Sequence, residues 1–265
     1  MVRIGVVGAG GRLGTALVAA IDAAEDLRLS AAADSGKAGL VLDHPSREAV
    51  TLLDSVEKFD FSTLDVVLEI SSPESAVANA TVALSNGCHV VIGTSGIGAS
   101  AQAELGALAE ERELGLLVVP NFALGGILLL RFAKEAARYF PSVEVIELHH
   151  PDKRDAPSGT ATHTLAVLAD AREAAGMAEP PDATDMVGLE GSRGGVGPGG
   201  IHVHSVRLSG LVAHEEILFG GPGEQLTLRH DSFDRTSFAA GALLALRSVC
   251  RLRGLTVGLD ALIQQ

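Results

Sequence analysis

The sequence predicts an α/β protein that combines a doubly wound parallel sheet with a second, α+β domain built on a mixed or antiparallel sheet. In the first half of the chain, short apolar strands alternate with helical stretches, which is typical of a parallel sheet with helices on both faces. In the second half, strands follow one another across short Gly/Pro turns such as 220–223, which favours antiparallel pairing.

Composition limits the class of protein. The chain has 265 residues, of which 47% are hydrophobic and 20% charged, so it can bury the core of one large or two modest domains. A formal net charge of −13, an aromatic content of 3% and the lack of tryptophan argue against nucleic-acid binding. An anionic ligand must therefore be attracted by a local positive pocket.

Cysteine usage and hydropathy predict a cytoplasmic protein that does not enter a membrane. Cys88 and Cys250 are too few and too far apart for a disulfide framework or a zinc site, and they suit a reducing compartment. The chain enters directly into a strand without a basic-then-apolar signal region. The apolar stretch 114–133 is interrupted by Pro120-Asn121 and Gly125-Gly126, which favours a strand, a loop and a helix over a membrane span.

The N-terminal strand, Val2–Val7, is followed by a glycine-rich turn and by a helix predicted over Thr15–Ala24. This order is that of the pyrophosphate-binding turn of a Rossmann unit, where glycines let the backbone approach the phosphates. The spacing is G-x-x-G-x-x-G, because Leu13 stands where the last glycine of the commoner motif falls. A tight turn without a ligand also explains the glycines. The predicted cofactor-binding residues are Gly8, Ala9, Gly10, Gly11, Arg12 and Leu13.

Asp34 ends the second predicted strand, 27–33, where an acid would hydrogen-bond the adenosine ribose. A strand-end turn residue is the alternative interpretation of this aspartate. Ser35 follows rather than arginine, and only Arg12 or Lys37 could neutralise a 2′-phosphate. Either NADH or NADPH therefore suits the sequence.

Three further strands, 66–70, 89–93 and 116–119, alternate with helices predicted over 75–86 and 100–113. Two polar loops follow these strands and are candidates to hold the nicotinamide half of the cofactor, although ordinary strand-to-helix turns would also explain them. Their predicted cofactor-binding residues are Gly93, Thr94, Ser95, Val119, Pro120, Asn121 and Phe122. The stretch 36–64 shows no clear pattern.

The second half begins with a helix predicted over 124–140. Strands are expected at 142–150, 202–211, 215–219 and 224–230, and a last helix at 237–252 is expected to pack on the first domain. The segment 188–200 holds seven glycines and is expected to form a lid or an arm. The predicted domains are 1–121 for the dinucleotide, 122–230 for substrate binding and oligomerisation, and 231–265 as a segment returning to the first domain.

The run from Glu147 to Thr160 concentrates the candidate chemistry. Its imidazoles, His149 and His150, can transfer protons near neutral pH. Its cations, Lys153 and Arg154, attract carboxylates, and the free N–H groups of a helix that starts near Ser158 also bind anions. Plain alternatives are a strand-end His150 satisfied by backbone and a solvated Arg154. With the glycine-rich turn, the run indicates a reductase acting on a small anionic substrate.

This run, Glu-x-His-His-x-x-Lys-x-Asp-Ala-Pro-Ser-Gly-Thr, resembles the signature of the dihydrodipicolinate (4-hydroxy-tetrahydrodipicolinate) reductase family. The resemblance covers nearly the whole chain. It includes the segments 8–12, 93–96, 120–122, 200–205, 207–210, 214–215, 234–235 and 238–239.

The resemblance implies reduction of a small dicarboxylate in the diaminopimelate route to lysine, with domain closure over both ligands and a homotetramer formed through the second domain's sheet. It implies His149 as proton donor and acceptor and Lys153 as a second proton donor. The substrate-binding residues that it implies are His150, Lys153, Ser158, Gly159 and Thr160.

Departures from the family pattern lie around the predicted cofactor site. Glu69-Ile70-Ser71 stands where Asp-Phe followed by Ser or Thr is usual, Ser95 replaces a frequent threonine, Ile97 a frequent phenylalanine and Ala123 a frequent serine. These differences bear on cofactor preference and affinity rather than on the reaction.

Rival functions are less well supported. Another two-domain dehydrogenase of the phosphorylating aldehyde type needs a thiolate in the second domain, and neither Cys88 nor Cys250 is placed for it. A silent NAD(H)-binding regulator would be expected to have lost His149 or Lys153. A metal site on His202 and His204 lacks an evident carboxylate partner, so no metal is expected.

Overall fold

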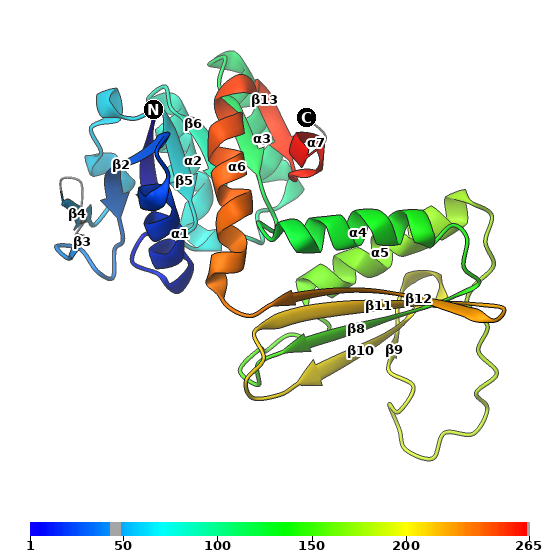
Figure 1. The fold of residues 1–265 in the computed structure, drawn as a ribbon. Coiled ribbons are helices and arrows are strands. Elements are labelled where there is room, and N and C mark those ends of the chain that lie inside the picture. The colour runs from blue at the N-terminus through cyan, green and yellow to red at the C-terminus, as the bar shows by residue number, and fades with distance from the viewer. Residues whose placement is uncertain (43–48, 264–265) are drawn as a thin grey trace. The chain divides into compact units, whose positions relative to one another are not determined.

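The computed structural model describes residues 1–42 and 49–263 and divides into two compact units (Figure 1). The first unit comprises Met1–Leu124 and Arg235–Gln265, and the second comprises Gly125–Asp234. The C-terminal segment thus belongs to the same unit as the glycine-rich turn.

The sheet of the first unit has eight strands in the order β13-β7-β6-β5-β1-β2-β4-β3, parallel except for β3, which pairs antiparallel with β4. Because the chain winds outward from β1 in both directions, the carboxyl ends of β1 and β5 form the switch point where such sheets bind ligands. The strands are β1 (Val2–Val7), β2 (Leu27–Ala33), β3 (Val41–Leu42), β4 (Val50–Leu53), β5 (Val66–Glu69), β6 (His89–Ile92), β7 (Gly115–Val118) and β13 (Gly254–Val257).

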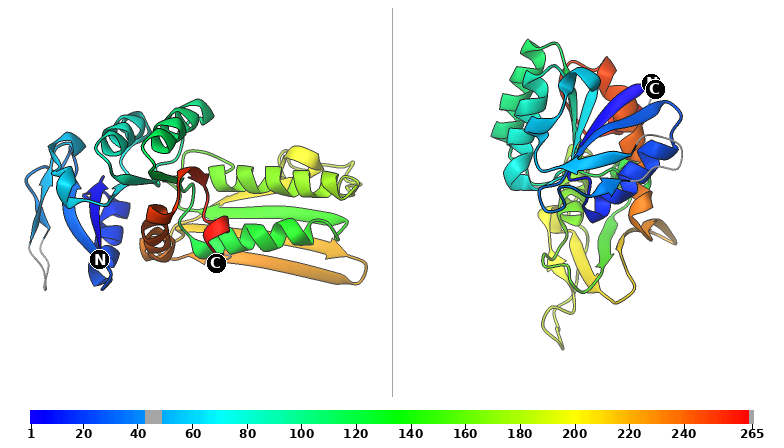
Figure 2. Two further views of the ribbon diagram at one scale, coloured as in Figure 1. Left: turned by 90° about the horizontal axis from the view of Figure 1, so that it is seen from above. Right: turned by 90° about the vertical axis from the view of Figure 1, so that its left-hand side faces the viewer.

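Helices cover both faces of this sheet (Figure 2). α2 (Pro73–Ser85) and α3 (Ala99–Glu111) contact each other on one face, and α1 (Arg12–Ala23) contacts α6 (Ala239–Ser248) on the other. A short α7 (Asp260–Ile263) follows β13. The apolar core between α2, α3 and the sheet includes Val67, Leu84 and Leu116, each fully buried. The predicted doubly wound sheet is confirmed.

Some boundaries in this unit differ from the expected ones. α1 begins at Arg12 rather than Thr15, because Gly11 takes the N-cap position directly after the turn. The expected last helix is shorter, with 3₁₀ turns at Arg235–Phe238 and Val249–Arg251 on either side of α6. Within the stretch 36–64 the structure shows β3, β4 and two 3₁₀ turns, Val56–Lys58 and Phe61–Thr63, while residues 43–48 lie outside the described residues.

The second unit holds a mixed sheet in the order β12-β11-β8-β10-β9. β10 runs parallel to β8, whereas β11 pairs antiparallel with both β8 and β12. The strands are β8 (Ser142–His149), β9 (Gly195–Val196), β10 (His202–Arg207), β11 (Ala213–Gly221) and β12 (Glu224–Ser232). The predicted mixed sheet is therefore confirmed.

Two helices, α4 (Leu124–Ala136) and α5 (Gly159–Ala174), pack on one face of this sheet. Alternate residues of β8 point to that face, so Val143, Val145 and Glu147 are buried. α4 ends at Ala136 rather than at residue 140, and turn residues 137–139 lead to Pro141. β10 ends at Arg207 rather than residue 211, just before a turn that contains Gly210 at φ +93°.

Among the described residues, no helix is long and apolar enough to cross a bilayer.

Candidate active site

The glycine-rich turn lies at the switch point of the first unit's sheet. Gly8 has φ +88°, and its N–H donates to the Ala33 carbonyl at 2.9 Å. A Cβ at Gly14 would lie 2.1 Å from the Gly8 oxygen, so only glycine lets α1 start this close to the strand. The first N–H groups of α1 have no partner within the helix and are available to an anion.

Asp34 lies beside this turn, as the sequence suggests. Its carboxylate accepts hydrogen bonds from the backbone N–H of Gly10 at 3.0 Å and of Gly36 at 3.1 Å. The Lys37 ammonium donates to the Gly10 carbonyl at 2.5 Å. The structure thus brings an acid and a cation together at the turn, whereas Arg12 is exposed on α1.

A cavity of about 320 Å³ opens beside the turn and reaches the start of α2. Two glycines of the turn, Asp34 and several serines contribute to its wall. It is lined by Val7, Gly8, Gly11, Ala33, Asp34, Ser35, Asp54, Ser55, Val56, Ile70, Ser71, Ser72, Ser75 and Asn79.

Glu69 ends β5 and is a buried carboxylate whose structural role the sequence did not reveal. It accepts hydrogen bonds from the backbone N–H of Ser71 at 2.8 Å, from the Ser71 hydroxyl, from the Asn79 amide at 2.9 Å and from the Thr94 hydroxyl at 3.3 Å. Burial raises the pKa of Glu69, and these hydrogen bonds oppose that rise. Through this one side chain, the loops after β5 and β6 are joined.

The two loops predicted for the nicotinamide half contact each other. A Cβ at Gly93 would lie 2.3 Å from the Phe122 ring, so the buried Phe122 packs directly on the glycine. Asn121 accepts the Ala123 N–H at 2.9 Å, and Val119 is buried after β7. Ser95 and Pro120 are exposed.

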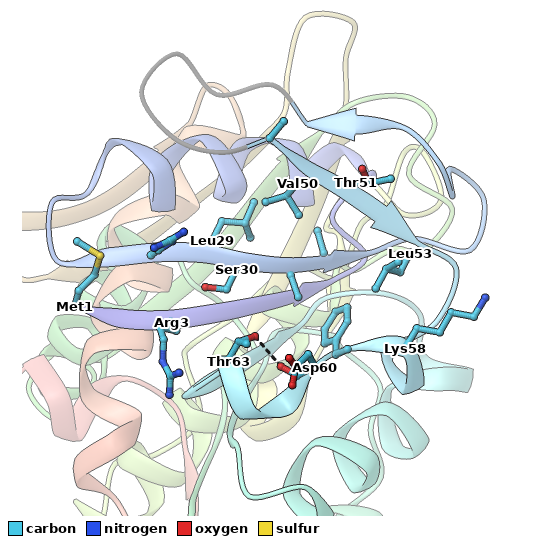
Figure 3. A pocket seen from close by; sticks show the side chains of 15 residues that line it. Met1, Arg3, Leu29, Ser30, Val50, Thr51, Leu53, Lys58, Asp60 and Thr63 are labelled. Carbon is cyan, nitrogen blue, oxygen red and sulfur yellow. Dashed lines mark hydrogen bonds between the residues drawn. The ribbon is translucent and has the colours of Figure 1, made fainter.

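A larger cavity of about 720 Å³ opens elsewhere in the first unit, between β2, β4 and the 3₁₀ turns (Figure 3). Leu29, Val50 and Leu53 contribute apolar wall, and Arg3 and Lys58 lie at its border. It contains none of the predicted site residues, which lie at the carboxyl ends of the strands.

Glu147 is the centre of the hydrogen-bond network in the second unit. The side chain is 1% exposed, and Arg207 binds both of its oxygens, with Nη1 donating to Oε2 at 2.9 Å and Nη2 donating to Oε1 at 2.8 Å. The His149 Nδ1 lies 2.5 Å from Oε2, and the Ser158 N–H donates to Oε1 at 3.3 Å. Burial alone would raise the pKa of Glu147, but the hydrogen bonds from Arg207, Ser205 and His149 outweigh it and lower this pKa.

His149 is held in one orientation by this network. Since an ionised carboxylate only accepts hydrogen bonds, the imidazole donates its Nδ1–H to Glu147, which leaves Nε2 free to exchange a proton. Burial lowers the pKa of His149, the hydrogen bond and charge of Glu147 raise it, and the charges of Lys153 and Arg207 lower it. With its side chain 14% exposed, His149 can act as a proton donor or acceptor.

The loop between β8 and α5 carries the cation and the helix start. The Lys153 ammonium lies 2.9 Å from Asp155, whose pKa it lowers. The Asp155 carbonyl accepts from Arg207 at 2.8 Å, so the loop is tied to the same guanidinium as Glu147. His150 lies one residue beyond β8, and its carbonyl accepts the Lys153 N–H at 3.2 Å. The peptide bond between Ala156 and Pro157 is cis.

Ser158 is the N-cap of α5, and its hydroxyl accepts the Ala161 N–H at 3.1 Å. Gly159 and Thr160 follow as exposed residues of the first turn, and no atom lies within 4 Å of the position that a Gly159 Cβ would take. The Gly159 N–H hydrogen-bonds the Asp155 carboxylate, and the Thr160 N–H is one of the groups that a helix start leaves without a helical partner, so this turn suits a carboxylate.

His202 and His204 do have carboxylate partners, which the sequence did not reveal. His202 Nε2 lies 3.0 Å from Asp182, and His204 Nε2 lies 2.7 Å from Glu144. Glu144 lies three residues before Glu147 on β8, and therefore on the opposite face of the sheet. Within residues 1–42 and 49–263, no group of three or more His, Cys, Asp and Glu side chains could hold a metal ion.

Comparisons with known proteins agree along the whole chain. Residues 2–122 match the family model "Dihydrodipicolinate reductase, N-terminus", and residues 125–263 match "Dihydrodipicolinate reductase, C-terminus". The chain is 47% identical over 260 residues to the 4-hydroxy-tetrahydrodipicolinate reductase of Nocardia farcinica, covering 98% of this chain and 97% of that protein. The reductase of Corynebacterium diphtheriae is 45% identical over the same shares of both chains.

A solved structure agrees with these relatives. The dipicolinate-bound dihydrodipicolinate reductase of Paenisporosarcina sp. TG-14 superposes with a TM-score of 0.86 at 36% identity. The match covers 98% of this chain and 99% of that one.

Proposed function

The chain belongs to the dihydrodipicolinate reductase family, whose reductases serve lysine biosynthesis, and we propose that it reduces the dehydrated form of 4-hydroxy-tetrahydrodipicolinate to tetrahydrodipicolinate with NADH or NADPH. The observation that carries this proposal is the buried Glu147–His149 pair, which leaves one imidazole nitrogen free in the network that also binds Ser158, the N-cap of α5. A proton-transfer group and an anion-binding helix start are thus linked by one carboxylate.

The glycine-rich turn fits a dinucleotide, because the close approach at Gly14 leaves the first N–H groups of α1 open. In this proposal Asp34 accepts hydrogen bonds from the adenosine ribose, and Lys37, already at the Gly10 carbonyl, neutralises a 2′-phosphate when NADPH is used. When bound, the reduced cofactor supplies the hydride. The pyrophosphate would be held by Gly8, Ala9, Gly10, Gly11, Arg12 and Leu13, and the nicotinamide half by Gly93, Thr94, Ser95, Val119, Pro120, Asn121 and Phe122.

The substrate carries two carboxylates, and the residues around the start of α5 suit them. The N–H groups of Gly159 and Thr160 would bind one carboxylate, together with Ser158 at the N-cap, and the substrate would take the place of the Asp155 carboxylate at Gly159. Lys153 is a cation in the loop before α5. Together with His150, it would bind the carboxylates of the substrate.

Reduction of a conjugated C=C–C=N system leaves negative charge that must be protonated. His149 would supply this proton from Nε2 while Glu147 stabilises the imidazolium through Nδ1. Lys153 would act as a second proton donor, since its ammonium is held by the exposed Asp155 and can exchange with solvent.

Assembly and location complete the proposal. We infer a homotetramer formed through the sheet of the second unit, whose face opposite α4 and α5 carries the partly exposed side chains of Ile146, Leu148, Val206 and Leu218. A cytoplasmic location agrees with two free cysteines. Light scattering at several protein concentrations tests the assembly, and a monomer at all concentrations would contradict it.

The activity is tested by following the absorbance loss of reduced cofactor while a coupled synthase generates the substrate. We expect turnover with at least one of NADH and NADPH, and much weaker turnover for His149→Gln. If the wild-type protein shows no turnover above background with either cofactor, the proposed function is wrong.

A further inference from the structure

A second buried carboxyl group, that of Glu215, lies beside Glu147 on the neighbouring strand. Glu215 on β11 is directly opposite Glu147 in the antiparallel register of β8 and β11, so both side chains point to the sheet face that carries α4 and α5. Facing residues on neighbouring antiparallel strands have Cβ atoms only about 4.5–5.5 Å apart. Two glutamates therefore share one buried region.

The two carboxyl groups have unequal surroundings. Glu147 receives hydrogen bonds from Arg207, His149 and Ser158, and both of its oxygens are used. Glu215 is 8% exposed, and its Oε1 has no hydrogen-bond partner among the described residues. A buried polar atom without a partner is costly, so it calls for an explanation beyond packing.

Within residues 1–42 and 49–263, no lysine or arginine forms an ion pair with Glu215. Thr164 of α5 contributes a hydrogen bond, and His230 of β12 lies opposite Glu215 on its other side, with a pKa that burial lowers. The first turns of α4, residues 124–130, hold only Leu, Ile and Gly. The Arg207 guanidinium and the His149 imidazole are both bound to Glu147.

We propose that Glu215 is a positioning residue of the proton-transfer site. It places a second carboxylate beside Glu147, and the added negative charge stabilises the His149 imidazolium that Glu147 binds. This inference rests on the proposed function, because it takes His149 as the proton donor. Glu215 contacts neither substrate nor cofactor in this arrangement and acts through Glu147.

The titration of Glu215 supports this role. Burial raises the pKa of Glu215 to about 6, the Thr164 hydrogen bond opposes the rise, and the charge of Glu147 adds to it. At neutral pH Glu215 is therefore ionised, and its negative charge favours a protonated His149. Below that pKa, Glu215 is neutral in the wild type as well, so this support is lost and the charge difference from a glutamine at this position disappears.

The test compares kcat/KM against pH for the wild type and Glu215→Gln. Since the amide lacks the charge, the pKa of His149 should fall by about 0.5–1 unit, which is about 3–10-fold in kcat/KM at pH 7–8 with almost no difference at pH 5. A merely structural role would lower kcat/KM equally at all pH values. Glu215→Asp, which keeps a carboxylate, should restore part of the loss.

Glu224→Gln is the matched control. Glu224 is an exposed residue at the start of β12, so removing its charge should leave the pH profile equal to that of the wild type. If the Glu215→Gln profile also matches the wild type throughout, the proposal is wrong.

A second readout needs no turnover and no variant of Glu215. In the unmodified protein, the NMR shifts of the His149 ring, assigned by their loss in His149→Gln, should show an extra inflection where Glu215 titrates. A single inflection would overturn the coupling between the two side chains. An enzyme without activity that still shows the extra inflection would count against the proposed function and in favour of the coupling.

Discussion

Arg207 binds both oxygens of the buried Glu147 carboxylate, at 2.8 and 2.9 Å, and the same guanidinium also donates to the Asp155 carbonyl at 2.8 Å. The two residues are 60 positions apart in sequence and meet because β8 and β10 are neighbouring parallel strands. This ion pair fixes the acceptor of the His149 N–H and also the loop that carries Lys153.

We expect Arg207→Met to destabilise the fold by about 3–5 kcal/mol at pH 7, because it leaves a buried charge uncompensated. Urea unfolding measures this loss. The pKa of Glu147 is lowered in the folded state by Arg207, so the pair stabilises the protein above the carboxyl's unfolded pKa and loses effect as pH falls. The deficit of the variant should therefore be smaller at about pH 3.5, below the unfolded pKa, than at pH 7, and an equal deficit at both would contradict the assignment.

The role of His149 predicts that His149→Gln lowers kcat by about 100-fold and changes KM little, since the imidazole acts mainly in the transition state. Glutamine retains a side-chain N–H for Glu147, so the network should survive and the unfolding midpoint should stay close to the wild type. Steady-state kinetics with the synthase-coupled substrate measure this effect. A wild-type kcat would remove the proton-donor role.

Asp34 should set the preference between the two cofactors. Asp34→Ala removes a ribose acceptor and a negative charge beside Lys37, so KM for NADH should rise about 10-fold while KM for NADPH rises less or falls. Asp54→Asn is the control, because Asp54 lines the same cavity but binds Lys58 at 2.8 Å. Should the ratio of the two KM values stay constant in Asp34→Ala, Asp34 has no part in recognising the ribose.

Local sequence features predicted much of the fold. The apolar stretch 142–150 predicted the strand that the structure shows as β8, and Ser158 predicted the start of α5. The glycine-rich turn also followed from sequence, because Gly8 and Gly14 meet a steric need within a few residues. Such features depend on neighbours in the chain, which periodicity and turn chemistry describe well.

Features that depend on distant partners were not predictable in the same way. β13 is a short edge strand that pairs with β7 along its whole length, and its four residues carry no distinct pattern. The contact of Arg207 with Glu147 depends on strand register, which sequence periodicity does not specify. The roles of His149, Lys153 and the α5 start stay predictions until their variants are measured.

Arg172 is a further long-range contact, and it predicts a stability effect without a change in chemistry. The side chain is buried near the end of α5, and its guanidinium donates to the carbonyls of Phe140 at 2.7 Å, Pro141 at 2.9 Å and Ala178 at 2.7 Å. It thereby ties the end of α5 to the segment between α4 and β8.

We expect Arg172→Met to cost about 2–4 kcal/mol of unfolding free energy, because the aliphatic stem is kept while three partly buried carbonyl hydrogen bonds lose their donor. Urea unfolding measures this change, with Arg138→Met as control, since Arg138 is exposed and pairs with the exposed Glu135 at 3.2 Å. Activity per folded molecule should be close to the wild type. An Arg172→Met protein as stable as the control would show that these carbonyls find water instead.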